Sequence, residues 1–195
     1  QEAQILEAER LCQGKKLLDL RPYRARRAGV IITGSEIYTG RIKDKFEPVV
    51  RAKLAHYPGE ILDVTICDDD LDMIVNTAKG DLAQGADFLI FTGGMSVDPD
   101  DLTPTAIRQL GAEIITHGVP AQPGNMTLVA YLGDVPTLGV PGAAISMPTT
   151  TFDVLLPQIY AGDRLTHEDL IRLGDGGLCR LCKPCHFPNC TFGRY

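Results

Sequence analysis

The feature that most constrains the fold of this sequence is a repeated pattern in which a short apolar run ends in glycines. In residues 86–104 the apolar run Phe88–Phe91 leads directly into Gly93 and Gly94. A run this short and this apolar is typical of a strand buried in the core. Adjacent glycines allow a sharp turn and let the backbone approach a ligand, because no Cβ is in the way. We therefore expect an anion-binding loop directly after this strand.

Short apolar runs alternate with helical patterns from residue 29 onwards, which predicts an α/β fold with a mainly parallel sheet. The expected strands are residues 29–33, 60–67, 87–92, 112–119, 126–132 and 135–140, and the expected helices are residues 44–56, 71–83, 103–110 and 152–160. The last three strands have little helix between them, which predicts a meander or an addition at one edge. Thr103 is expected to cap its helix, and Thr166 to open a short last helix through a capping box.

A second glycine loop, residues 138–146, follows another short apolar run. In open α/β sheets, ligands bind beyond the carboxyl ends of the strands. We therefore expect one pocket built from the ends of several strands.

The length of 195 residues and the 44% hydrophobic content predict one cored domain of about 150 residues with tails, rather than two full domains. We expect residues 1–27 to be a linker or docking helix, 28–160 to form the binding domain, 161–178 to hold a short helix and linker, and 179–195 to form a cysteine-rich tail. Because the chain opens on Gln1, we expect a fragment of a longer protein with a missing upstream domain.

Charge and hydropathy exclude two classes of partner. The net charge of −6 and the isoelectric point near 5.2 leave no basic face that could neutralise many phosphates, which argues against nucleic acid. No apolar run approaches the roughly 18 residues that span a bilayer, and the first twenty residues lack the apolar centre of a signal peptide. We expect a cytoplasmic protein whose partner is a small molecule or another protein.

Acidic residues follow two of the expected strands, as Asp68–Asp70 and as Asp98, Asp100 and Asp101. Carboxylates at neighbouring strand ends repel each other unless a cation lies between them, and such oxygen ligands suit Mg²⁺ bridged to a substrate phosphate. The functional interpretation is therefore a magnesium-assisted phosphate site. The alternative interpretation is that these acids cap the following helix, form a turn and are otherwise solvated.

The loop at residues 33–45 offers hydroxyls, glycine amides and the cations Arg41, Lys43 and Lys45. Such groups could hold a phosphate at the same pocket, although charged residues before a helix are also commonly just solvated. The loop lacks the Gly-Lys-Ser/Thr ending of a P-loop, and the glycines at 93–94 do not fit the dinucleotide fingerprint. Ordinary NTPase and dehydrogenase functions are therefore excluded.

The second strong signal is at the C-terminus, where Cys179, Cys182, Cys185 and Cys190 occur within twelve residues. In an acidic chain expected in the cytoplasm, this spacing favours a metal over disulfides. Thiolates so close in sequence suit tetrahedral Zn²⁺ or an iron–sulfur cluster, with His186 as a spare ligand. The alternative is a set of free thiols.

Five short motifs occur in order along residues 28–160. They are Thr33-Gly34-Ser35-Glu36, Asp68-Asp69, Thr92-Gly93-Gly94-Met95-Ser96 with Asp101, Pro123-Gly124-Asn125 and Gly139-Val140-Pro141-Gly142-Ala143. In this order they resemble the molybdopterin-binding domain shared by the MoeA, MogA and MoaB families. The resemblance implies a three-layer α/β/α fold that binds molybdopterin or adenylyl-molybdopterin together with Mg²⁺. It also implies assembly as a dimer or trimer.

The resemblance implies a role for individual residues. Asp68 and Asp101 match the family's functional aspartates, which are catalytic and hold Mg²⁺. The residues implied to bind the pterin phosphate are Thr33, Gly34, Ser35, Glu36, Thr92, Gly93, Gly94, Ser96, Pro141 and Gly142. The Gly-Gly-Met-Ser loop resembles the MoeA insertion branch more than the adenylyltransferases, whereas Gly-Ala-Ala replaces the usual Gly-Asn-Pro after Pro141.

The resemblance therefore implies a function in molybdenum cofactor biosynthesis, as a molybdopterin molybdotransferase-like protein that supports magnesium-assisted molybdate insertion. The altered loop after Pro141 and the unusual tail favour one alternative, a non-catalytic module that senses or carries the pterin. Another alternative is an adenylyltransferase or a CinA-like nucleotide pyrophosphatase that uses the same loops on a dinucleotide.

Overall fold

The centre of the molecule is one six-stranded sheet with the strand order β2-β1-β3-β6-β5-β4. This arrangement comes from a computed structural model, which describes residues 2–13, 19–96 and 101–194. The strands are β1 (Arg26–Thr33), β2 (Gly59–Cys67), β3 (Phe88–Thr92), β4 (Glu113–His117), β5 (Leu128–Leu132) and β6 (Val135–Val140). The first four strands in the order are parallel, and β5 and β4 continue the sheet antiparallel. The predicted parallel sheet with a meander at one edge is confirmed.

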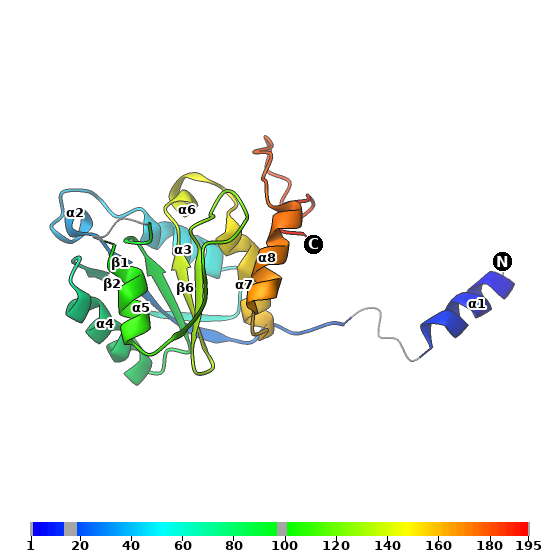
Figure 1. Cartoon of the computed structure of the whole chain (residues 1–195), viewed down its shortest axis with the longest axis horizontal. Coiled ribbons are helices and arrows are strands. Elements are labelled where there is room, and N and C mark those ends of the chain that lie inside the picture. The colour runs from blue at the N-terminus through cyan, green and yellow to red at the C-terminus, as the bar shows by residue number, and fades with distance from the viewer. Residues whose placement is uncertain (1, 14–18, 97–100, 195) are drawn as a thin grey trace.

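Helices cover both faces of the sheet, so the fold has three layers, α/β/α (Figure 1). The helices of the body are α2 (Ser35–Tyr38), α3 (Phe46–Leu54), α4 (Leu71–Ala83), α5 (Thr103–Gln109), α6 (Ala143–Ser146), α7 (Thr151–Ala161) and α8 (His167–Arg172), which continues as a 3₁₀ turn (Leu173–Gly176). α4 and α5 pack on one face, and α3 and α7 pack on the other. The predicted three-layer fold class is confirmed.

The central position of β3 in the sheet explains why residues 88–91 are all apolar. All five of its residues are buried. Phe88 and Ile90 belong to the core under α3 and α7, whereas Leu89 and Phe91 belong to the core under α4 and α5. Because successive side chains of a strand point to opposite faces, a central strand with helices on both sides needs apolar residues at every position.

Side-chain caps fix where several helices begin. Asp70 accepts a hydrogen bond from the N–H of Met73 (2.7 Å) at the start of α4, so this acid is used as a cap. The predicted capping box of Thr166 and Asp169 is present at the start of α8. The expected Thr103 cap is wrong, because α5 includes Thr103 in its first turn and the hydroxyl of that residue bonds elsewhere.

The predicted elements are all present, with ends within three residues of those expected. The short helices α2 and α6 fall in segments that the sequence predicted as loops. Each has four residues, which is too few for an apolar periodicity of 3.6 to show in the sequence.

The N-terminal helix α1 (Glu2–Cys12) has no buried residue and lies away from the body in Figure 1. The chain contacts the body from Arg21 onwards, where the Arg21 guanidinium pairs with Asp163, the N–H of Arg24 donates to the carbonyl of Tyr160 (2.8 Å) and the ring of Tyr23 lies against Tyr57. Within the described ranges, no helix has both the length and the apolar character needed to cross a membrane.

Candidate functional site

The carboxyl ends of the four parallel strands lie at the same end of the sheet, which we call the carboxyl edge. Thr33 at the end of β1 is in register with Cys67 at the end of β2, and Thr92 at the end of β3 is in register with Val140 at the end of β6. The loops that leave this edge contain the residues predicted to bind a ligand. The topology therefore brings the predicted residues to one side of the molecule.

A cavity of about 340 Å³ opens between the loops after β3 and β6 and the segment before β5. It is lined by Phe46, Gly93, Gly94, Met95, Ser96, Asp101, Gly124, Asn125, Met126, Pro141, Gly142 and Ala143. Six of these were predicted as site residues, namely Gly93, Gly94, Ser96, Asp101, Pro141 and Gly142. The structure therefore brings together residues from three separate motifs.

The two glycines after β3 are required by the close approach of this loop to β1. Gly93 has a φ of 82°, and a Cβ on this residue would lie 2.1 Å from the carbonyl oxygen of Thr33. Gly94 has a φ of 50°, and its Cβ would lie 2.9 Å from the hydroxyl of Thr103. Both positions therefore exclude a side chain, and the bare backbone forms part of the cavity wall.

A buried pair of threonines holds this loop in place. The hydroxyl oxygen of Thr33 is 3.1 Å from that of Thr103, and Thr103 donates to the carbonyl of Gly93 (3.0 Å). Both threonines are almost fully buried. Thr103 therefore positions the loop, a role that the sequence did not predict for it because its partner Thr33 is 70 residues away.

Met95 and His117 anchor the far end of the loop. The Met95 side chain is buried against Gly139 of β6, where a Cβ would lie 2.2 Å from the Met95 Cε atom. The Nε2 atom of His117 on β4 is 3.1 Å from the carbonyl oxygen of Met95. His117 was not predicted from the sequence, since its position on β4 becomes relevant only when β4 lies beside the loop.

Asp101 is the acidic residue in the cavity wall. Its Oδ2 atom is buried and has no hydrogen-bond partner among residues 2–13, 19–96 and 101–194. A buried polar atom without a partner costs about 1–3 kcal/mol, and more when it is charged. Asp101 therefore lies in the cavity wall with one carboxylate oxygen whose hydrogen bonding is not satisfied by the described residues. Asp98 and Asp100 lie outside the described residues.

Ser35 and Asp68 meet at the neighbouring strand ends. The Ser35 hydroxyl donates to Asp68 Oδ1, and the Ser35 N–H donates to Asp69 Oδ2 (2.9 Å). Glu36 is exposed in the first turn of α2. These residues do not line the cavity, because β2 lies two strand spacings, about 10 Å, from β3. A ligand that contacts both Asp68 and Asp101 must extend along the sheet edge.

The remaining predicted pocket residues differ in exposure. Arg41, Lys43 and Lys45 are exposed on the loop before α3 and are not among the residues that line the cavity. Thr92 is fully buried at the end of β3, and its hydroxyl has no partner among the residues that the structure describes. Gly34 links β1 to α2 with a φ of 144°.

The four tail cysteines line a separate small cavity of about 40 Å³. The hydroxyl of Thr149 is 3.3 Å from the sulfur of Cys185, and this contact, together with the N–H of Phe187, lowers the pKa of the Cys185 thiol. Across the described ranges, no group of three or more His, Cys, Asp or Glu side chains is positioned to hold a metal ion.

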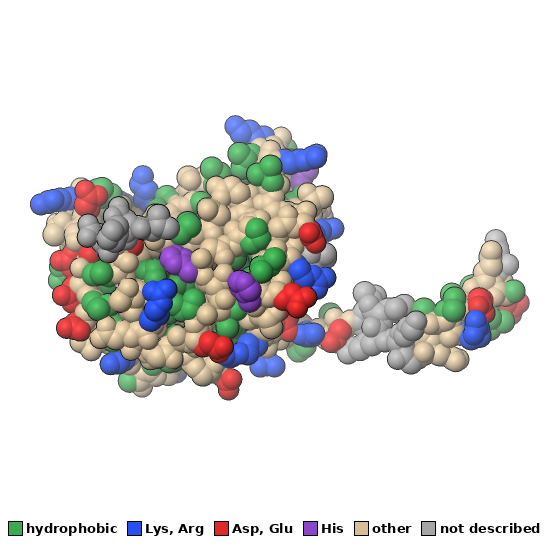
Figure 2. Space-filling model, viewed as in Figure 1, with side chains coloured by type: hydrophobic (Ala, Val, Ile, Leu, Met, Phe, Trp, Pro, Cys, Tyr) green, Lys and Arg blue, Asp and Glu red, His purple; other side chains and the backbone are tan. Residues whose placement is uncertain are grey.

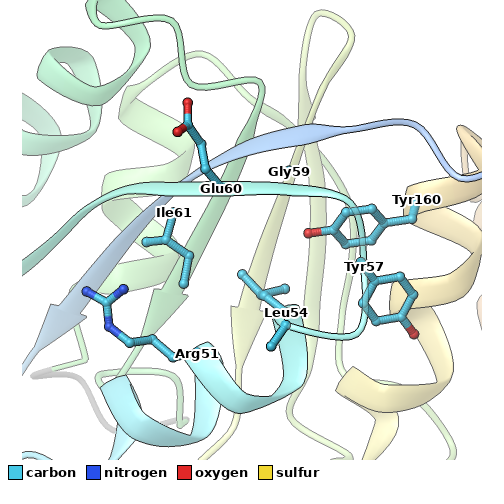
Figure 3. Close-up of a pocket in the computed structure, with 8 residues that line it drawn as sticks. Arg51, Leu54, Tyr57, Gly59, Glu60, Ile61 and Tyr160 are labelled. Atoms are coloured by element: carbon cyan, nitrogen blue, oxygen red, sulfur yellow. The ribbon is translucent and has the colours of Figure 1, made fainter.

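Another cavity, of about 270 Å³, lies at the other end of the strands from the carboxyl edge (Figure 3). It borders Gly59, which is in register with the first residue of β1, so it lies at the amino ends of the strands. The rings of Tyr57 and Tyr160 stack there with centroids 4.4 Å apart, and burial raises the pKa of each phenol to about 12. None of the predicted site residues lines this cavity.

Comparison with known proteins extends the resemblance. A CinA-like protein of Mycobacterium sp. strain JLS is 37% identical over 90 residues, which is 46% of this chain and 21% of that protein. The molybdopterin molybdenumtransferase of Bacillus subtilis strain 168 is 31% identical over 121 residues, which is 58% of this chain and 28% of that protein. The chain therefore spans less than a third of the length of these two relatives.

The crystal structure of the molybdopterin biosynthesis enzyme MoaB from Thermus thermophilus has a TM-score of 0.55 to this chain at 18% identity, over 71% of this chain and 98% of that one. This likeness concerns the fold. A family model described as a probable molybdopterin binding domain matches residues 29–161, which is more than half of the chain and includes every residue that lines the cavity. The chain therefore belongs to the family of molybdopterin-binding domains and is related to the proteins of molybdenum cofactor biosynthesis.

Proposed function

We propose that the cavity at the carboxyl edge binds molybdopterin or adenylyl-molybdopterin, and that the chain supports magnesium-assisted insertion of molybdate into the pterin. The single observation that carries this proposal is that Asp101, a carboxylate with no partner for its Oδ2 atom in the described ranges, lines a cavity whose wall includes bare glycine backbone. A negatively charged ligand needs both features, since the backbone can approach it closely and the carboxylate can address it through a cation.

The phosphate end of the pterin is assigned to the loop after β3. Gly93 and Gly94 present backbone without side chains, and the exposed Ser96 offers a hydroxyl. In the loop after β6, a Cβ on Gly142 would meet no atom within 4 Å, so the backbone there is open to a ligand. A ligand in the cavity can therefore approach the backbone of both loops.

Asp101 has the chemistry to hold Mg²⁺, because this ion takes one or two carboxylates and fills its other positions with water and substrate phosphate. A bound Mg²⁺ would supply charge neutralisation as a phosphoanhydride is formed or cut. Asp68 already accepts a hydrogen bond from Ser35 and lies about two strand spacings away. We therefore assign Asp68 to the far end of an extended ligand.

The insertion branch of the family is supported by the Gly-Gly-Met-Ser sequence of the loop and by the 31% identity to a molybdopterin molybdenumtransferase. Assembly as a dimer or trimer stays a prediction, which size-exclusion chromatography with light scattering would test.

The second candidate function is hydrolysis of a dinucleotide in the same cavity. It is supported by the 37% identity to a CinA-like protein, and the aligned 90 residues are about half of this chain. The two candidates use the same glycine loops, so they differ in the ligand and in whether a bond is cut.

Two measurements on the full chain separate these candidates. Calorimetry with molybdopterin and with adenylyl-molybdopterin, with and without Mg²⁺, should show tight binding of the adenylylated form that depends on Mg²⁺. Incubation with ADP-ribose should leave it intact. Hydrolysis of ADP-ribose without pterin binding would favour the second candidate, and a folded protein that binds neither pterin would contradict the proposal. Pterin binding without conversion of the adenylylated form in the presence of molybdate would indicate a carrier module.

A further inference from the structure

We propose that the four tail cysteines, Cys179, Cys182, Cys185 and Cys190, bind one Zn²⁺ ion that fastens the tail to the binding domain. All four side chains line a single cavity of about 40 Å³, together with His186. Cysteines brought around one small cavity have the tetrahedral ligand count that structural zinc sites use.

Two of the four thiols are already fixed on the body. The N–H of Cys179 donates to the carbonyl of Gln122 (2.8 Å), and Cys179 and Cys190 both pack against the core. Phe192, which follows closely in the chain, is buried. The other two thiols, those of Cys182 and Cys185, are exposed on the segment between these anchors. The tail therefore presents two ligands that are fixed on the body and two on an exposed segment, of which Cys185 also contacts the Thr149 hydroxyl.

The backbone already turns toward the sulfur of Cys179. The N–H of Leu181 donates to the sulfur of Cys179 (3.4 Å), and this turn places Leu181 in the left-handed region, with a φ of 53°. That conformation costs a non-glycine residue about 1 kcal/mol.

Thr149 and nearby Lys and Arg side chains surround the four tail cysteines with groups that suit a bound metal ion. The Thr149 hydroxyl lies 3.3 Å from the sulfur of Cys185, and it would donate a hydrogen bond to the thiolate of that cysteine once an ion is bound. Four thiolates and one Zn²⁺ carry a net charge of −2, and cations nearby would offset it. Arg180 lines the cavity, Lys183 lies between two of the cysteines in the sequence, and Figure 2 shows Lys and Arg side chains at the upper tip of the molecule.

Four thiolates suit either one Zn²⁺ ion or an iron–sulfur cluster, and the metal analysis below distinguishes the two. In the described part of the chain the thiols do not yet form a closed ligand group. The exposed segment from Cys182 to Cys185 must therefore move onto the ion, so metal binding and ordering of the tail are coupled.

The test uses the full chain purified without oxygen, with Zn²⁺ and then Co²⁺ as probes. We expect one zinc ion per chain and, after exchange, one Co²⁺ with the absorption bands of a tetrahedral thiolate site. Cys182→Ser and Cys185→Ser should each weaken binding about a hundredfold or more, and Thr149→Val about tenfold. Cys12→Ser, which changes a cysteine of α1, is the matched control and should leave binding unchanged.

Several results would overturn the zinc site. They are absence of stoichiometric metal, equal loss in Cys12→Ser, isolation with iron and acid-labile sulfide, and disulfides among the four cysteines in freshly purified protein. Cys182 and Cys185 are exposed, so unfolding curves should show that their serine variants keep the fold. Pterin binding by the cavity at the sheet edge is measured separately, so failure of one proposal leaves the other standing.

Discussion

Asp81 and Asp101 each have a buried Oδ2 atom without a hydrogen-bond partner in the described ranges, but the two carboxylates face different surroundings. Asp81 of α4 lies over β1, where a Cβ on Gly29 would be 2.4 Å from its Oδ2 atom, so there is no room for a ligand. Asp101 lies in the wall of a cavity of about 340 Å³. An unpartnered carboxylate is therefore a candidate site only where its residue lines a cavity that could hold a ligand.

The largest expected loss of stability comes from adding a side chain at Gly93, in the cavity wall that also contains Asp101. Gly93→Ala places a methyl group 2.1 Å from the carbonyl oxygen of Thr33 at a φ of 82°. We expect the free energy of unfolding to fall by about 3 kcal/mol, because backbone must move on both strands. Denaturant unfolding measures this loss. Gly133→Ala is the matched control, since its φ is 58° and no atom lies within 4 Å, so it should cost about 1 kcal/mol.

The next effect concerns Asp81. Burial, with a smaller contribution from the charge of Asp63, raises the pKa of Asp81 to about 6. The folded state therefore binds more protons than the unfolded state between about pH 4 and pH 6, and the free energy of unfolding falls as the pH rises through this range. Asp81→Asn should remove this fall and make the protein about 2 kcal/mol more stable at pH 8.

Unfolding curves at pH 4, 6 and 8 check the prediction for Asp81. Asp72→Asn, an exposed change on the same helix, should follow the wild-type pH dependence. If the free energy of unfolding of Asp81→Asn still falls between pH 4 and pH 6, ionisation of Asp81 is not what destabilises the fold. The contrast between the enclosed Asp81 and Asp101 would then be wrong.

Much of the fold could be predicted because its signals are local. The continuous apolar run of β3, the glycines that follow it and the capping box at Thr166 each lie within a few residues. The edge meander is also visible, because β4, β5 and β6 follow one another without a long helix between them. Local patterns of this kind predict the strands and the mainly parallel sheet, and so that the loops gather beyond the carboxyl ends of the strands.

The parts of the site that could not be predicted depend on contacts between distant residues. Thr103 was expected to cap a helix, yet its hydroxyl lies 3.1 Å from that of Thr33. His117 reaches the Met95 carbonyl only because β4 lies beside the loop after β3. The lack of a partner for Asp101 Oδ2 in the described ranges is likewise a property of the folded chain, which no spacing in the sequence can reveal.

The most direct test of the central claim is the affinity of adenylyl-molybdopterin, with and without Mg²⁺, for the wild-type chain, Asp101→Asn and Asp81→Asn. Asp101→Asn should bind at least tenfold more weakly in the presence of Mg²⁺, which corresponds to about 1.4 kcal/mol, and should lose the dependence on Mg²⁺. Asp81→Asn, which changes the enclosed carboxylate, should bind like the wild type. Equal affinity of all three proteins, with or without Mg²⁺, would contradict the assignment of Asp101 and its cavity as the binding site.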